Sequence, residues 1–295
     1  MKEIIKRIVS QLKPVSGTIE SKDTNIYSYI KNGRIPWSPG YNDYKYKFIS
    51  ETINAPHQVN LFKNKSLPRD FAKGIDERAV EYPWIFSKLS AGNGMLLDAG
   101  STFNFDFIVE HPEIKKKELT IYTFFPEKNC FYKNRINYVY GDLRQLYFRD
   151  TVFDEIVSQS TIEHIDMDNS IYGYEESNEK GKKSYEYLNA VAEMIRVLKP
   201  NGRLLLTFPF GKYENHGFFQ QFDQEMLERL LDLFKEKGKT DMDYFKYEAE
   251  GWRFARKEEM SNVESYNPHS GKGKLNDGAA HCRGIACIEF IKNNS

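Results

Sequence analysis

Short apolar runs recur through the middle of the chain and predict a parallel sheet. The clearest run lies at residues 95–100, where apolar side chains are consecutive rather than alternate. This pattern is typical of a strand that is buried on both faces. Segments with helical periodicity separate several such runs and favour βαβ units. We expect five strands, at residues 95–100, 119–124, 136–140, 153–158 and 203–208.

The last third of the chain predicts two further strands. They are Asp243–Ala249 and Ile285–Ile291, which a polar segment separates, and they could run antiparallel. The expected fold class is therefore α/β. It is a doubly wound, mostly parallel seven-stranded sheet with helices on both faces, an N-terminal extension and a C-terminal insertion.

Two segments have the clearest helical periodicity. The first is Ser184–Leu198, which places its apolar residues on one face and is followed by Lys199–Gly202, a predicted helix stop and turn. The second begins after Asp223, a typical N-cap residue, and carries leucines at helical spacing. Both helices would cover the sheet.

The first 80 residues are interpreted as an N-terminal extension. Apolar side chains at residues 3–12 have helical spacing and predict a short amphipathic helix. Residues 13–80 lack strong periodicity and are rich in tyrosine, asparagine, lysine and proline, so we expect a mostly irregular segment with short helices. The aromatic content argues against disorder. The main domain is placed at residues 81–295.

Composition excludes several classes of protein. The 295 residues include 42 Lys and Arg and 42 Asp and Glu, so no global field draws the chain to nucleic acid or to an anionic membrane. No apolar stretch reaches the roughly 20 residues that span a bilayer, and the charged start is unlike a signal peptide. We expect a cytoplasmic protein. Cys130, Cys282 and Cys287 lack the paired spacing of a zinc site and are interpreted as reduced structural thiols.

Four motifs follow the predicted strands in order. They are Asp98–Asn104, Tyr140–Leu143, Phe153–Val157 with Ser160–His164, and Arg196–Leu204. In this order and spacing they resemble the signature blocks of class I S-adenosylmethionine-dependent methyltransferases, over about residues 94–212 of the main domain. Residues 213–295 would then supply the last strands and the insertion. Further segments, at 76–78, 81–84 and 209–217, are similar to a bacterial subgroup of unknown acceptor.

The resemblance implies where S-adenosyl-L-methionine binds. Gly100 would let backbone approach the methionine part, and Asp142 would accept the adenine amino group while Leu143 packs against the ring. The loop departs from the family at Thr102 and Asn104, where glycine is usual. The full set of expected cofactor-binding residues is Asp98, Gly100, Ser101, Thr102, Asn104, Thr123, Glu127, Gly141, Asp142, Leu143 and Ser160.

The roles expected of Glu127 and Asp98 are less direct. Glu127 is the carboxylate nearest to the end of the second strand, where the family holds the ribose hydroxyls with an acid, and it would replace that acid. Asp98 could contact the cofactor or could brace the loop. We also expect Gly100→Val to weaken cofactor binding and to leave the fold intact.

His164 and His216 follow the fourth and fifth strands and are the candidate catalytic bases. Glu163, Asp166 and Asp168 are interpreted as parts of a solvated loop, and no metal is expected. The predicted function is O- or N-methylation of a small polar acceptor, such as a carbohydrate-related molecule, without nucleic acid. The alternative is a non-catalytic binding or scaffold protein that retains the fold. A dehydrogenase is disfavoured because the Gly-x-Gly-x-x-Gly loop is missing.

Overall fold

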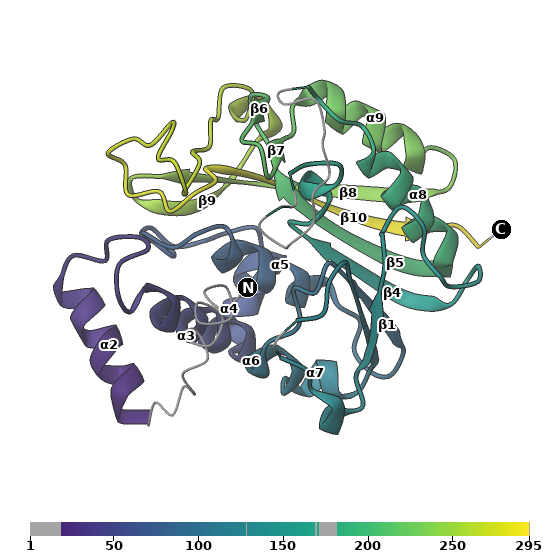
Figure 1. Cartoon of the computed structure of the whole chain (residues 1–295), viewed down its shortest axis with the longest axis horizontal. Helices are drawn as coiled ribbons and strands as arrows, with labels where there is room; N and C mark the ends of the chain where they lie inside the picture. Colours follow the sequence, from purple (N-terminus) through teal and green to yellow (C-terminus); the bar gives the residue numbers. More distant parts are fainter. Residues whose placement is uncertain (1–18, 128, 169, 171–181, 295) are drawn as a thin grey trace, which may run out of the picture.

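The computed structural model describes residues 19–127, 129–168, 170 and 182–294 (Figure 1). The helix predicted at residues 3–12 lies outside this part of the chain. Among the described helices, none is long and apolar enough to cross a membrane. The cytoplasmic location stays a prediction.

An eight-stranded sheet runs through the molecule in the order β3-β2-β1-β4-β5-β10-β8-β9. Strands β1 to β5 pair in parallel, and β10 runs antiparallel to both β5 and β8. The strands are β1 (Met95–Ala99), β2 (Glu118–Thr123), β3 (Asn137–Tyr140), β4 (Phe153–Gln159), β5 (Leu198–Pro209), β8 (Gly238–Glu248), β9 (Gly251–Ala255) and β10 (Gly284–Lys292). The seven predicted strands are confirmed.

The eighth strand, β9, was not predicted. It forms a hairpin with β8, in which Glu248 pairs with Gly251. Gly251 has a φ of 96°, and a Cβ built there would lie 2.4 Å from the carbonyl oxygen of Phe71. Only glycine fits this turn easily. A small two-stranded sheet, β6 (Glu214–Asn215) and β7 (Gln220–Gln221), follows β5.

Helices cover both faces of the sheet, as expected for a doubly wound fold (Figure 1). Leu96, Val157 and Leu205 face the cluster that includes the helices before β1, and their neighbours Leu97 and Ile156 face the opposite cluster. The helices on the first face are α3 (Tyr41–Asn54), α4 (Pro56–Lys63), α5 (Arg78–Lys88), α6 (Asp106–Val109) and α7 (Pro112–Lys115). Those on the second face are α8 (Tyr187–Val197) and α9 (Gln224–Phe234).

The two predicted helices are confirmed with small changes. Helix α8 ends at Val197, and β5 begins at once. The predicted turn at residues 199–202 falls within the bounds of β5. These residues have no partners in β4, whose pairing passes from Leu198 to Arg203, and Asn201 has a φ of 59°. Before α9, Asp223 accepts a hydrogen bond from the backbone N–H of Met226 at 3.1 Å, so it is the N-cap.

The expectation of a mostly irregular segment at residues 13–80 is wrong. Helix α2 (Ile19–Lys31) precedes α3 and α4, so most of the described front segment is helical. The helical period was hidden because α3 buries polar side chains: Lys45 lies in the inner row with Ile49 and forms an ion pair with Asp76 at 2.7 Å. Whether residue 80 is a domain boundary stays a prediction.

Candidate cofactor and acceptor site

The loop after β1 is held by Asp98. The carboxylate is fully buried and accepts hydrogen bonds from the backbone N–H groups of Thr102, at 3.2 Å, and Phe103, at 2.7 Å, and from the Thr102 hydroxyl. Burial raises the pKa of Asp98 to about 7, although these hydrogen bonds oppose the shift. Both oxygens of Asp98 therefore face the loop itself, which favours the bracing role over cofactor contact.

Gly100 lies against the side chain of Thr161, in the loop after β4. Its φ is 129°, and a Cβ built there would lie 2.1 Å from Oγ1 of Thr161, just after β4. Ser101 follows with a φ of 64°. Its hydroxyl is buried and, within the described residues, has no hydrogen-bond partner. The loop therefore has an unsatisfied donor where the cofactor was predicted.

The loops after β1 and β2 meet at Asn104. Its amide donates to Glu127 at 2.7 Å and to the carbonyl of Asn129 at 2.9 Å, and its Oδ1 accepts from the Tyr138 hydroxyl. Thr123 ends β2 beside Tyr140, the last residue of β3. Two residues predicted to bind the cofactor from different loops, Asn104 and Glu127, are thus in direct contact.

The motif after β3 is also organised by local contacts. Asp142 binds the side chain of Arg144 through both oxygens, at 2.6 to 3.1 Å, and accepts its backbone N–H at 2.8 Å. Leu143 is buried in the core. A Cβ on Gly141 would lie 2.2 Å from the Tyr122 hydroxyl. An adenine amino group at Asp142 would therefore share the carboxylate with Arg144.

Glu81 of α5 joins the ends of β4 and β5. Its carboxylate accepts the hydroxyls of Ser160 and Thr207, the latter at 2.6 Å, and pairs with Arg78 at 2.8 Å. Ser160, predicted to contact the cofactor, thus gives its hydroxyl to a protein partner. Sequence reasoning missed Glu81, although the segment 81–84 was noted as similar to a bacterial subgroup.

The two candidate bases meet around one phenyl ring. Phe219 lies 4.5 Å from the ring centre of His216, in parallel stacking, and 6.1 Å from that of His164. His281, just before β10, is 4.9 Å away on the same ring. Nδ1 of His164 lies 2.7 Å from the carbonyl oxygen of Phe218. A carbonyl only accepts, so this Nδ1 carries the proton and Nε2 is the basic nitrogen.

Two buried carboxylates border this cluster. Oε2 of Glu163 and Oε2 of Glu77 have no hydrogen-bond partner among the described residues. Burial raises the pKa of Glu163 well above its usual range and that of Glu77 to about 8, and other nearby carboxylates add to both shifts. Burial also lowers the pKa of His164 to about 4. Glu163, interpreted as part of a solvated loop, is instead 2% exposed, so that expectation is wrong for this residue.

Asp166 and Asp168 behave as loop residues. Asp166 accepts the hydroxyl of Ser184 at 2.7 Å and lies 3.8 Å from Arg144. Asp168 accepts the backbone N–H of Ser170 at 3.0 Å. Neither carboxylate belongs to a group that could hold a metal ion within the described part of the chain.

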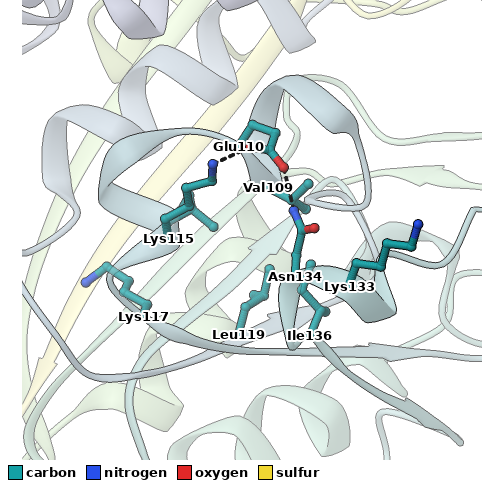
Figure 2. A pocket seen from close by; sticks show the side chains of 9 residues that line it. Val109, Glu110, Lys115, Lys117, Leu119, Lys133, Asn134 and Ile136 are labelled. Carbon is teal, nitrogen blue, oxygen red and sulfur yellow. Dashed lines mark hydrogen bonds and ion pairs between the residues drawn. The ribbon is translucent and has the colours of Figure 1, made fainter.

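A cavity of about 250 Å³ lies at the opposite edge of the sheet, where β2 and β3 begin (Figure 2). Lysines line it, but Lys115 pairs with Glu110, and Lys117 pairs with Glu155. Ligands of open α/β sheets bind beyond the carboxyl ends of the strands. The cavity is therefore separate from the predicted site.

The strand order, the helices on both faces and the loops at the carboxyl edge define a Rossmann-like α/β protein. Residues 123–206, from the end of β2 into β5, match a family described as a methyltransferase domain. Over these residues the chain is thus similar to methyltransferases, and S-adenosylmethionine as its methyl donor stays a prediction. No curated protein matches the chain in sequence.

Several solved structures are similar in fold. The [4+2]-cyclase SpnF has 17% identity and a TM-score of 0.43, over 70% of this chain and 76% of that one. A methyltransferase from Methanosarcina mazei has 15% identity and a TM-score of 0.42, over 72% and 98%. The 1,6-didemethyltoxoflavin-N1-methyltransferase of Burkholderia thailandensis has 14% identity and a TM-score of 0.38, over 68% and 72%. This likeness carries no argument about substrate.

Proposed function

We propose that the chain methylates a hydroxyl or amino group of a small polar acceptor, bound beyond the ends of β4 and β5. The observation that carries this proposal is a set of buried acceptor atoms, Oε2 of Glu163 and Oε1 of Gln159, without hydrogen-bond partners in the described structure. A buried unsatisfied acceptor costs about 1–3 kcal/mol. O–H or N–H groups of the acceptor molecule would satisfy these oxygens.

The charge of this region supports a neutral or cationic acceptor. Glu77, Glu81 and Glu163 surround one guanidinium, that of Arg78, which interacts electrostatically with all three. Arg78 is paired with Glu81 at 2.8 Å, and the carboxyl groups of Glu77 and Glu163 can form hydrogen bonds with hydroxyl or ammonium groups. A polyhydroxylated molecule such as a sugar or amino sugar fits this chemistry better than nucleic acid does.

The proposed roles divide along the carboxyl edge. Gly100, Ser101, Asn104, Glu127 and Asp142 would hold the cofactor, which supplies an activated methyl group. Since that group needs little further activation, the protein mainly aligns the acceptor and takes its proton. His164 and His216 are the proposed proton acceptors. Asp98 and Ser160 would position the two loops.

The test is transfer of labelled methyl from S-adenosylmethionine to a panel of polyols, amino sugars and their phosphorylated forms. We expect transfer to the unphosphorylated compounds and a raised KM in Glu163→Gln, which removes the buried acid. Glu228→Gln, on the exposed face of α9, is the control. Faster transfer to the phosphorylated forms would contradict the acceptor class. Cofactor binding without transfer to any compound, including cell extract metabolites, would favour the scaffold alternative.

A further inference from the structure

Three side chains of types that can coordinate metals lie close together beside the proposed acceptor region. They are Glu77, immediately before α5, and His281 and Cys282, which precede Arg283 and the start of β10. One possible ligand atom from each lies within 4.8 Å of the others. We propose that these three residues bind a zinc ion. The sequence predicted no metal, because Glu77 is some 200 residues from the other two and only the fold brings them together.

A backbone carbonyl fixes the tautomer of His281. Its Nδ1 lies 2.8 Å from the carbonyl oxygen of Tyr266. The carbonyl fixes the proton on Nδ1 and leaves Nε2 with its lone pair. Metal-binding histidines usually donate their other ring N–H to a carbonyl or carboxylate in this way, which fixes both tautomer and ring orientation.

Glu77 supplies an oxygen that lacks a partner. The residue is 7% exposed, and its Oε2 makes no hydrogen bond within the described structure. An isolated buried carboxylate is costly unless it is protonated, paired or bound to a metal. Arg78 lies nearby, but its guanidinium pairs with Glu81 at 2.8 Å. A divalent cation would bind the unpartnered Oε2 of Glu77.

The donor set selects zinc among common divalent ions. Calcium and magnesium prefer all-oxygen sites, whereas thiolate, imidazole and carboxylate together are typical of zinc. Tetrahedral zinc with bonds of about 2.0–2.3 Å places its ligand atoms roughly 3.5 Å apart. Atoms separated by at most 4.8 Å would need to approach by about 1 Å. Three protein ligands leave the fourth position for water.

The proposed zinc site adjoins the candidate bases but does not depend on them. Phe219 contacts the rings of both His281 and His216. The zinc proposal concerns metal binding alone, so it can hold or fail whatever the acceptor is.

Metal content and a cobalt spectrum test the proposal on the full chain. We expect the chelator-treated protein to bind one Zn²⁺ per chain. Co²⁺ in its place should show tetrahedral visible bands and a thiolate-to-cobalt band in the near ultraviolet. Cys282→Ser should abolish the thiolate band. Glu77→Gln and His281→Gln should weaken Zn²⁺ binding at least about tenfold, the smallest effect usual even for removing a partner of a ligand.

The matched control is Cys130→Ser/Cys287→Ser, which leaves Cys282 as the single thiol. It should keep the thiolate band, and this result does not require the ligand variants to fold. A cobalt complex without that band, or its loss in the control, would overturn the proposal. So would the absence of Zn²⁺ binding, or equal affinity in wild type and folded ligand variants.

Discussion

The side-chain amide of Asn104 donates a hydrogen bond to the carboxylate of Glu127, with 2.7 Å between Nδ2 and Oε2. This contact joins the loop after β1 to the loop after β2. Asn104 is buried and is itself held by the Tyr138 hydroxyl, whereas Glu127 is exposed. A fixed residue thus positions an accessible carboxylate after β2, where the sequence predicts a contact with the ribose hydroxyls of the cofactor.

Glu127→Ala should therefore weaken S-adenosylmethionine binding. Removing charged hydrogen bonds of about 1.5–3 kcal/mol raises the dissociation constant by roughly ten- to 150-fold. Calorimetric titration with the cofactor measures this change. Glu118→Ala, at the opposite end of β2 and exposed, should leave affinity unchanged. Equal affinity in both variants would remove Glu127 from the cofactor site.

Asp142→Ala should weaken cofactor binding by a similar factor, because the adenine amino group would lose its acceptor. Arg144 already occupies part of this carboxylate, so Arg144→Ala should leave Asp142 available and change affinity less. Asp150→Ala, whose exposed carboxylate pairs with Arg196, is the control. If Arg144→Ala were the more harmful variant, Asp142 would act by holding Arg144 and not by contacting adenine.

Substitution of Gly100 should lower stability, contrary to the expectation that Gly100→Val leaves the fold intact. A Cβ there meets Oγ1 of Thr161 at 2.1 Å and requires a side chain at a φ of 129°. Such backbone strain alone costs about 1–3 kcal/mol. We expect denaturant unfolding to show Gly100→Ala as destabilised.

A second variant, Thr161→Ala, tests whether the Thr161 side chain causes this loss of stability. The double variant Gly100→Ala/Thr161→Ala should lose less stability than the sum of the two single variants, because the closest clash is removed. The backbone strain would remain. Additive losses would mean that Thr161 does not cover Gly100 in solution.

Much of the fold followed from local sequence patterns. The buried runs at β1, β4 and β5 and the helical stripe of α9 carry their periodicity in consecutive residues. Helix α3 lacks a clear apolar periodicity because its buried row includes Lys45. The ion pair with Asp76 neutralises Lys45, and no local sequence pattern reveals that contact. Strand β9 likewise depends on a glycine turn packed against Phe71.

The candidate site was partly predictable. Asn104 and Glu127, and His164 and His216, follow the ends of strands, and parallel strands bring their carboxyl ends to one edge. Glu81 belongs to the helix before β1, and its contacts with Ser160 and Thr207 exist only after that helix packs across the sheet. Residues at helix ends far from the motifs carry no local signal of this kind.

His164 should make stability depend on pH in the acid range. Burial lowers its folded pKa to about 4, against about 6.5 in the unfolded chain. As pH falls, His164 therefore takes up a proton in the unfolded state first. The contribution of the neutral imidazole to folded stability is complete above about pH 6.5 and is lost as pH falls toward 4. The loss is up to about 3 kcal/mol. Urea unfolding at several pH values measures it.

The His164 ring faces several other charged groups, so the comparison must be between variants. Glu163 lies 3.8 Å from Nε2, and Arg78 and His281 interact with the ring electrostatically. The raised pKa of Glu163 has the opposite effect, because its contribution to the free energy of unfolding declines as pH rises. His164→Gln should flatten the acid slope relative to wild type. The exposed His57→Gln should not, and an unchanged slope in both would refute the buried neutral imidazole.

The last prediction separates the two candidate bases. His216 lies 3.6 Å, through Nε2, from Oε2 of Glu214, a carboxylate that would stabilise the imidazolium formed on taking a proton. His164 also has a carboxyl group nearby, Glu163 at 3.8 Å, but the raised pKa of Glu163 favours its neutral form and the lowered pKa of His164 makes the imidazole a weak base at neutral pH. With an identified acceptor, His216→Gln should lower kcat by about 100- to 10,000-fold and keep cofactor affinity. His164→Gln should act mainly on stability. The reverse pattern would make His164 the base, and turnover within about threefold of wild type in both would leave alignment as the source of catalysis.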